Sequence, residues 1–192
     1  MQRIILGIDP GSRTTGYSIL INENGKLTAL RCDVLRMAKL DNHADRLQYI
    51  FEHLGNIVRS FHPTECAIET PVYGKDPQAM LKLGRAQAAC ILAATTNDIP
   101  VIEYYPKAVK KSITGNGNAS KKQVAFMLRK MVTLEEEKLP NDATDALAVA
   151  WCHMVKQSAF DSGIPKSQKK HHQNRKGSSW EEFVKNNPDR VR

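Results

Sequence analysis

The fold is indicated first by one N-terminal stretch, RIILGIDPGSRTTGYSILI, which spans residues 3–21. Its first part, Arg3 to Asp9, is a short apolar run that ends on an acid, and such a run is typical of a buried strand. Its second part, Thr14 to Ile21, alternates and is rich in β-branched residues, which predicts a second strand. Residues 22–25 (Asn-Glu-Asn-Gly) have hairpin-turn chemistry, and residues 27–35 predict a third strand. A β-meander therefore opens the chain.

Helices and strands alternate after this meander. In chain order, the expected elements are a helix over Asn42–Phe61, a strand over Glu65–Glu69, a helix over Pro77–Asn97, a strand over Val101–Tyr105, a short helix from Pro106, and two helices over about Ser120–Thr133 and Pro140–Gln157. Three consecutive strands followed by strands separated by helices predict an α/β fold, with a five-stranded mixed sheet flanked by helices.

The composition is that of an ordinary globular chain, since 41% of the 192 residues are hydrophobic and 25% are charged. No apolar run approaches the ~20 residues of a membrane helix. Asp9 follows only a few apolar residues, which argues against a signal peptide. We therefore expect a cytoplasmic protein. Four widely spaced cysteines indicate reduced, mostly buried thiols: Cys32, Cys66, Cys90 and Cys152.

Bases exceed acids, and the formal net charge of +8 favours polyanionic partners. Much of this charge lies at the C-terminal end, where residues 161–192 contain few apolar residues and one pair each of Lys-Lys, His-His and Arg-Lys. Such a segment cannot bury a core. We expect one folded domain over residues 1–158 and a basic, disordered tail over residues 159–192.

Four acids are candidates for a metal site. Asp9 and Glu69 each end an apolar strand, so they share one edge of the sheet if these strands are neighbours. Asp142 and Asp145 are three positions apart in the first turns of the last helix and lie on one face of it. Carboxylates are the ligands that Mg²⁺ takes in proteins, and two such ions can activate water and stabilise the leaving oxygen of a phosphodiester. Spacing alone leaves a second interpretation open, in which these acids merely begin loops or a helix.

A family resemblance supports the metal site. It is carried by the stretches Gly7–Tyr17 (GIDPGSRTTGY), Cys66–Glu69 (CAIE), Leu81–Ala86 (LKLGRA), Glu103–Tyr104, Lys110, Thr114–Lys121 and Asp142–Ala148 (DATDALA). In this order they are similar to RuvC-type Holliday junction resolvases, members of the RNase H-like superfamily. Any one stretch is weak evidence, but together they cover about residues 3–157 in the family's order.

The resemblance implies a structure-specific endodeoxyribonuclease of DNA recombination and repair. It implies a homodimer that binds a four-way DNA junction and cuts two opposing strands by paired symmetric nicks that leave 5′ phosphates. It also implies two Mg²⁺ ions per active site, with Mn²⁺ as a substitute, held by the catalytic residues Asp9, Glu69, Asp142 and Asp145. A branch-migration helicase complex of the RuvA/RuvB type is expected as a partner from the resemblance alone.

Basic and aromatic residues are the candidates for DNA contacts. Lys110 and Lys121 fall where the family carries lysines needed with DNA, and both can neutralise phosphate near the acids. Neighbouring basic residues extend this expectation, although each taken alone is better explained as a solvated surface charge: Lys82, Arg85, Lys107, Lys111 and Lys122. Many relatives have an aromatic wedge three residues after the strand acid, where this chain has Val72. The next residue, Tyr73, can stack on a base instead.

The predicted helix over Pro77–Asn97 is apolar on more than one side, which is compatible either with a dimer interface or with burial inside the domain. Three rival functions remain to be weighed. Another RNase H-like nuclease, acting on RNA–DNA hybrid or other nucleic acid, shares the acids. An actin-like or sugar-kinase phosphotransferase needs two such domains, for which this chain is too short. A non-catalytic DNA-binding module is disfavoured because carboxylates without metal repel phosphate.

Overall fold

The computed structural model describes residues 2–72, 74, 76–134 and 139–161, and of residues 157–161 only the backbone. The strands are β1 (Arg3–Asp9), β2 (Thr14–Glu23), β3 (Lys26–Arg36), β4 (Glu65–Glu69), β5 (Val101–Tyr104) and β6 (Thr133–Leu134). The helices are α1 (His43–Phe61), α2 (Pro77–Thr95), α3 (Pro106–Thr114), α4 (Lys121–Met131) and α5 (Asn141–Asp161). The predicted tail, residues 159–192, lies almost wholly outside the described residues.

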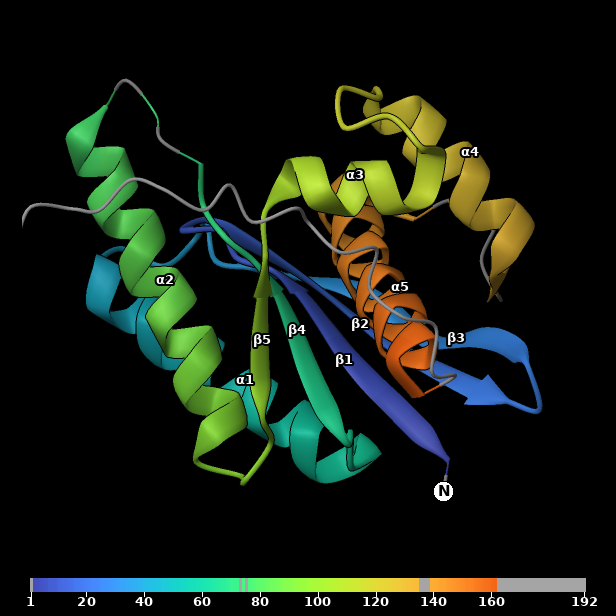
Figure 1. The fold of residues 1–192 in the computed structure, drawn as a ribbon. Helices are drawn as coiled ribbons and strands as arrows, with labels where there is room; N and C mark the ends of the chain where they lie inside the picture. The colour runs from blue at the N-terminus through green and yellow to red at the C-terminus, as the bar shows by residue number, and fades with distance from the viewer. Residues whose placement is uncertain (1, 73, 75, 135–138, 162–192) are drawn as a thin grey trace, which may run out of the picture.

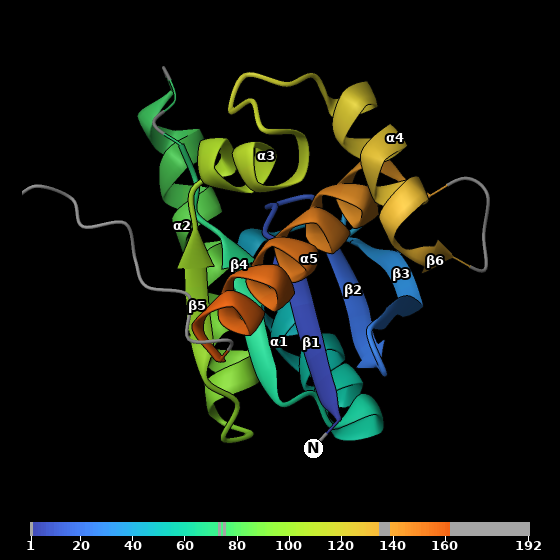
Figure 2. The same ribbon diagram turned by 45° about the vertical axis from the view of Figure 1, so that its right-hand side comes forward.

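The strands form one mixed sheet in the order β5-β4-β1-β2-β3-β6 (Figures 1 and 2). β2 is antiparallel to both of its neighbours, β1 and β3, whereas β4 pairs with β1 in parallel and β5 pairs with β4 in parallel. The predicted α/β fold with a mixed sheet is confirmed. The prediction of five strands was wrong by one, because α4 ends at Met131 and Thr133–Leu134 pairs with Thr28–Ala29 of β3. Val132, with its β-branched side chain, is already extended and begins this departure from the helix.

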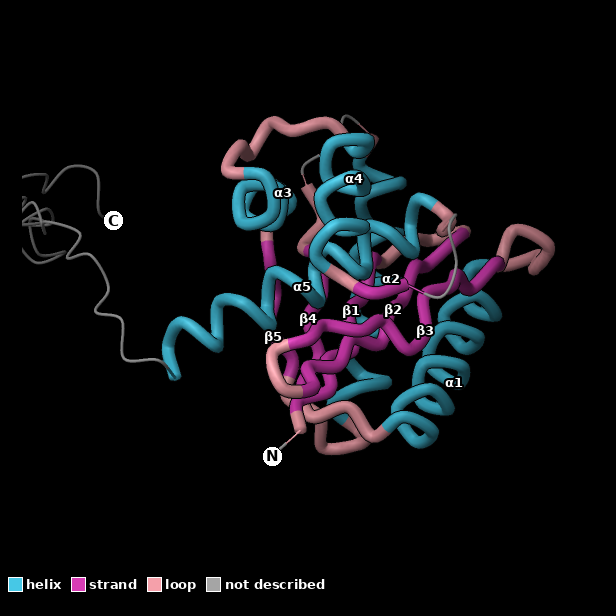
Figure 3. The backbone as a smooth tube through the Cα atoms, turned by 90° about the vertical axis from the view of Figure 1, so that its right-hand side faces the viewer, coloured by secondary structure: helices cyan, strands magenta, loops and turns pink. Residues whose placement is uncertain are grey.

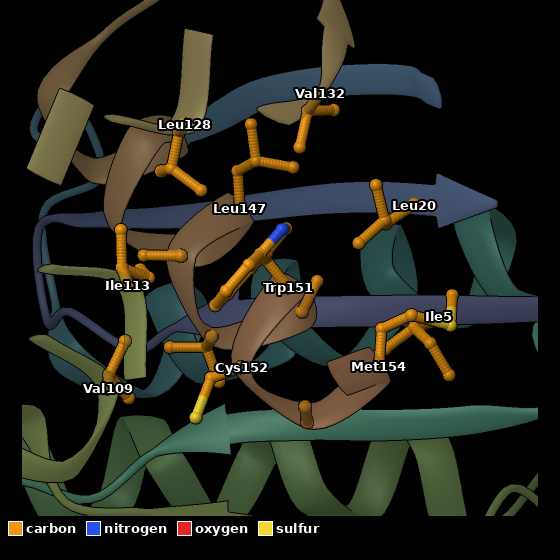
Figure 4. Packing of buried hydrophobic residues seen from close by; sticks show 14 of the residues in the cluster. Ile5, Leu20, Val109, Ile113, Leu128, Val132, Leu147, Trp151, Cys152 and Met154 are labelled. Carbon is orange, nitrogen blue, oxygen red and sulfur yellow. The ribbon is translucent and has the colours of Figure 1, made fainter. Parts of the chain in front are cut away.

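Helices cover both faces of the sheet. α5, with α3 and α4 beside it, lies on one face, and α1 and α2 lie on the other (Figures 2 and 3). Alternation along β1 supplies both cores: Ile5 packs under α5, whereas Leu6 and Ile8 pack against α1 and α2. Figure 4 shows Leu147 and Trp151 of α5 among apolar side chains from the sheet, α3 and α4.

The four predicted thiols are mostly buried in the described structure. Cys66, Cys90 and Cys152 are buried, Cys32 is partly buried, and all four are outside disulfides, as expected. Among the described helices, none combines the length and the apolar character that a membrane span requires.

Candidate active site

Two parallel strands bring the first two acids together. β1 and β4 are hydrogen-bonded neighbours in register Ile8↔Ile68, so the next residues, Asp9 and Glu69, end adjacent strands at the same edge. Alternation from Ile5 places Asp9 on the α5 face of the sheet. β1 and β4 both end on the side of the sheet where α5 begins (Figure 1), so Asp9 and Glu69 lie at this edge.

Two glycines let α5 approach the sheet closely enough to complete the cluster. A Cβ at Gly16 of β2 would lie 2.0 Å from the backbone oxygen of Asp142, and a Cβ at Gly7 of β1 would lie 2.2 Å from that of Ala146. The first turns of α5 therefore rest directly on the strand backbones. As a result, carboxylate oxygens of Asp9, Asp142 and Asp145 lie within 4.8 Å of one another.

The loop after β1 is fixed by a buried threonine. Thr15 Oγ1 donates a hydrogen bond to the backbone oxygen of Gly11 (2.9 Å) and accepts one from the Gly11 N–H (3.2 Å). This reciprocal pair closes the turn between β1 and β2. It therefore holds the backbone just beyond Asp9.

The acids strongly affect one another's ionisation. Burial, followed by the charges of Glu69, Asp145 and Asp142, raises the pKa of Asp9 to about 8. Burial and the charge of Asp145 raise the pKa of Glu69 to about 7. Glu69 is outside the set of three that share 4.8 Å, yet its charge is the largest acidic influence on Asp9. All four predicted acids therefore belong to one electrostatic unit.

Two of the predicted lysines lie close to these four acids. The ammonium of Lys121 forms an ion pair with Asp145 Oδ2, and its charge also lowers the pKa of Asp9. A capping box between Ser120 and Gln123 fixes the start of α4, so Lys121 occupies the first helical position. Lys110 of α3 lowers the pKa of Glu69 by its charge. Each lysine thus offsets part of the repulsion among the carboxylates.

The other predicted DNA contacts are distributed around the molecule. Lys82 and Arg85 lie exposed on α2. Burial lowers the pKa of His43 in α1, and the charges of Arg85 and Lys82 lower it further. Lys107 is exposed in α3, and Lys122 is exposed in α4. Val72 is exposed beyond β4. Tyr73 lies outside the described residues.

One buried polar chain under α5 was not predicted. Tyr104 Oη is 2.7 Å from Nδ1 of the fully buried His153, and His153 Nε2 is 2.8 Å from Glu65 Oε2. Arg3 donates to the other oxygen of Glu65 at 2.7 Å. Because the carboxylate only accepts, His153 Nε2 is the donor to Glu65 and Nδ1 accepts from Tyr104. The chain connects β1, β4 and β5 to α5.

The acid cluster suits a divalent cation. Among the described residues, Asp9, Asp142 and Asp145 are the one set of three His, Cys, Asp or Glu side chains close enough to hold a metal ion. Their donors are all carboxylate oxygens, which hard cations prefer. Burial and neighbouring acids raise the pKa values of Asp9 and Glu69, and the lysine charges offset only part of this effect. A bound cation would supply further positive charge.

The mixed sheet, with acids at its carboxyl edge and on the covering helix, defines an RNase H-like nuclease. A yeast mitochondrial Holliday junction resolvase shares the fold at a TM-score of 0.66 and 16% identity over 82% of this chain and 80% of that one. The family model of the crossover junction endodeoxyribonuclease RuvC matches residues 5–153. The chain belongs to this RuvC family.

Individual relatives agree over nearly the whole chain. The RuvC of Salinibacter ruber is 46% identical over 98% of both chains, and that of Cytophaga hutchinsonii is 43% identical over 100% of this chain and 90% of the relative. A structure of Thermus thermophilus RuvC in complex with a Holliday junction substrate superposes at a TM-score of 0.77 with 28% identity, covering 82% of this chain and 96% of that one.

Proposed function

We propose that this chain is a Holliday junction resolvase that cuts two opposing strands of a four-way DNA junction by paired symmetric nicks. The observation that carries this proposal is the cluster of Asp9, Asp142 and Asp145, with Glu69 beside it and Lys110 and Lys121 at its rim. Family membership supports the substrate class, and the Thermus thermophilus relative was solved with such a junction. The role belongs to recombination and DNA repair, and residues 1–158 form the proposed nuclease domain.

In this proposal Asp9, Glu69, Asp142 and Asp145 hold two Mg²⁺ ions, for which Mn²⁺ can substitute. When bound, the ions supply Lewis acidity for water activation and for the leaving oxygen. The carboxylates fix where a phosphodiester sits, since without a cation they repel its phosphate. Lys121 places positive charge beside Asp145 and Lys110 places it near Glu69. Both can attract a phosphate and stabilise the negative charge that develops on it during cleavage.

A second copy of this chain would supply the second cut. α2 exposes Leu81 and Leu92, which are 55% and 53% accessible, and Ala88 lies between them on the same exposed stripe. Spacings of seven and four residues keep these side chains on one helix face. Such a face suits packing against its own copy, and a twofold dimer matches the pseudo-twofold symmetry of a junction. A RuvA/RuvB-type helicase partner is proposed on family grounds only.

Four basic residues are proposed as additional contacts to the DNA arms. Lys82 and Arg85 lie beside the stripe on α2, and Lys107 and Lys122 lie on the helices that carry Lys110 and Lys121. All four are exposed and can contact phosphate oxygens. Tyr73 is kept as a proposed stacking residue of the loop after Glu69.

The test is a substrate panel. Wild-type protein and the Asp9→Asn variant are incubated with Mg²⁺ and a synthetic four-way junction, a linear duplex or an RNA–DNA hybrid of matched sequence. We expect the wild type to cut only the junction, and Asp9→Asn to bind the junction without cutting it. Preferred cutting of the hybrid would overturn the resolvase proposal in favour of another RNase H-like nuclease. Equal cutting by Asp9→Asn would indicate a contaminant.

A further inference from the structure

The most exposed large apolar side chains lie on segments that adjoin or carry residues of the candidate site. Among the described residues, three are more than 60% accessible: Tyr105 (69%), Val72 (64%) and Phe126 (62%). Val72 follows Glu69 by three positions, and Tyr105 directly follows Tyr104, the β5 partner of Glu69. Phe126 lies on α4, the helix that carries Lys121. Such a grouping near one site is characteristic of a surface that contacts a partner.

Phe126 in addition lines a cavity of about 380 Å³ between α4 and the loop that precedes it. The apolar part of the lining is Ala119, Phe126 and Met127, and the polar part includes Asn116, Lys122 and Gln123. An aromatic ring beside a few polar groups is the usual composition of a small-ligand site. The volume is sufficient for a planar heterocycle.

Charge around the cavity selects an anionic partner. α4 (Lys121–Met131) contains four basic residues and no acid. Lys122 lines the cavity, and the Lys130 ammonium lies 5.9 Å from the centre of the Phe126 ring. A basic surface interleaved with an exposed aromatic ring is the pattern by which proteins hold unpaired nucleic acid.

The side-chain amides of Asn116 and Gln123 line the cavity and can donate hydrogen bonds through their NH₂ groups. Gln123 Oε1 accepts from the backbone and hydroxyl of Ser120, and Asn116 Oδ1 accepts from the Asn118 N–H. Both amide oxygens are therefore occupied, which turns each NH₂ group away from these partners. Within the described part of the chain, neither NH₂ group has an acceptor. Nucleobases carry acceptors on their edges that can fill this role.

We propose that the cavity binds one unpaired nucleobase of a junction strand, stacked on Phe126 and contacted by the NH₂ groups of Asn116 and Gln123. Lys122 then contacts the adjoining phosphate. The inference rests on the proposed function and adds to it a base-reading site next to the cutting centre. Lys121, which pairs with Asp145, and Lys122, which lines the cavity, both lie in the first turn of α4, so the acids and the cavity are contacted by the same turn of helix.

The test uses junction binding in the non-cutting Asp9→Asn background. Phe126→Ala is compared with Phe126→Tyr, which keeps a stacking ring, and with Phe51→Ala, which removes an exposed phenylalanine from α1 on the other face of the sheet. A junction carrying 2-aminopurine at successive central positions reports stacking by its fluorescence. We expect Phe126→Ala to weaken junction binding by ~10-fold, the contribution of one stacked base. It also lacks the rise in 2-aminopurine fluorescence that accompanies removal of the base from the DNA stack, while Phe126→Tyr and Phe51→Ala resemble the parent.

Each alternative outcome is decisive. Unchanged junction affinity in Phe126→Ala overturns the inference, as does an equal loss for a fully paired linear duplex, since that would place Phe126 on a duplex arm. Thermal unfolding of each variant excludes a folding defect. If the wild type cuts junctions and Phe126→Ala behaves like its parent, only this inference fails. If the wild type cuts no junction, the proposed function fails and this site with it.

Discussion

The close approach of α5 to the sheet leads to a sharp expectation for Gly16→Ala. Gly16 pairs with Asp9 across β1 and β2, and its missing Cβ leaves the space that the Asp142 backbone occupies. An added Cβ would lie 2.0 Å from the Asp142 oxygen and 2.3 Å from its carbonyl carbon. Ordinary contact begins near 3.4 Å, so the start of α5 has to move by about 1.4 Å.

This displacement has two measurable consequences. Overpacking of this size typically costs ~1–3 kcal/mol of unfolding free energy, within the ~5–15 kcal/mol of a stable domain, so the variant still folds. A shift of ~1 Å in a catalytic group can cost ~100-fold in rate. We therefore expect Gly16→Ala to lose about 1–3 kcal/mol in urea unfolding and to cut the junction ~100-fold more slowly in single turnover.

Gly55→Ala in α1 is the matched control. The nearest atom to its added Cβ is a guanidinium nitrogen of Arg59 at 3.3 Å, which is the mobile end of a long side chain. Alanine is the better helix former by ~0.5–1 kcal/mol, so this variant is expected to be as stable as the wild type or more stable, with full activity. Wild-type stability and cutting rate in Gly16→Ala would refute the argument that α5 is seated through this glycine.

Three further expectations follow from the charged groups. Burial and neighbouring acids raise the pKa of Asp9 from its ordinary value of 3.8 to about 8 in the folded protein, so ionisation of Asp9 between these pH values opposes folding. In metal-free buffer at pH 8, we therefore expect Asp9→Asn to raise the free energy of unfolding by an amount on the order of 2–5 kcal/mol. Mg²⁺ then stabilises the wild type more than the variant, and equal melting curves would contradict the metal site. Lys121→Ala slows cutting by ~100-fold. It changes the free energy of unfolding by less than about 1 kcal/mol, because the ammonium of Lys121 is exposed in its ion pair. The control Lys26→Ala, at the distant hairpin, changes neither quantity. Burial lowers the pKa of His153 below 6.5, so its protonation opposes folding and the free energy of unfolding falls as pH drops below that value. In His153→Gln this fall is smaller. An unchanged pH profile would count against the buried Tyr104–His153–Glu65 chain.

The acid cluster was predictable because its members are marked locally. Asp9 and Glu69 end short apolar strands, and Asp142 and Asp145 share one helix face. Parallel pairing of β1 and β4 brings the first two acids together, and the packing of α5 on the sheet adds the other two. Most predicted element boundaries lie within a few residues of the observed ones for the same reason. Asn42 caps α1 and Ser120 caps α4, and both are residue types that commonly begin helices.

Features that depend on distant contacts could not be predicted. β6 has two residues and no alternation of its own, and it is a strand only because β3 lies beside it. The need for glycine at Gly16 appears only when α5 crosses β2. His153 and Glu65 are 88 positions apart, and neither position stands out in sequence as a member of a buried hydrogen-bonded chain.

The most direct test of the central claim is to map the cuts in a four-way junction whose four strands are labelled one at a time. With Mg²⁺, the account predicts nicks at symmetric positions on one opposing pair of strands, with 5′ phosphates that ligase can reseal, and none with Asp9→Asn. Cuts on adjacent strands, unpaired nicks at unrelated positions, or ends that ligase cannot seal would contradict it.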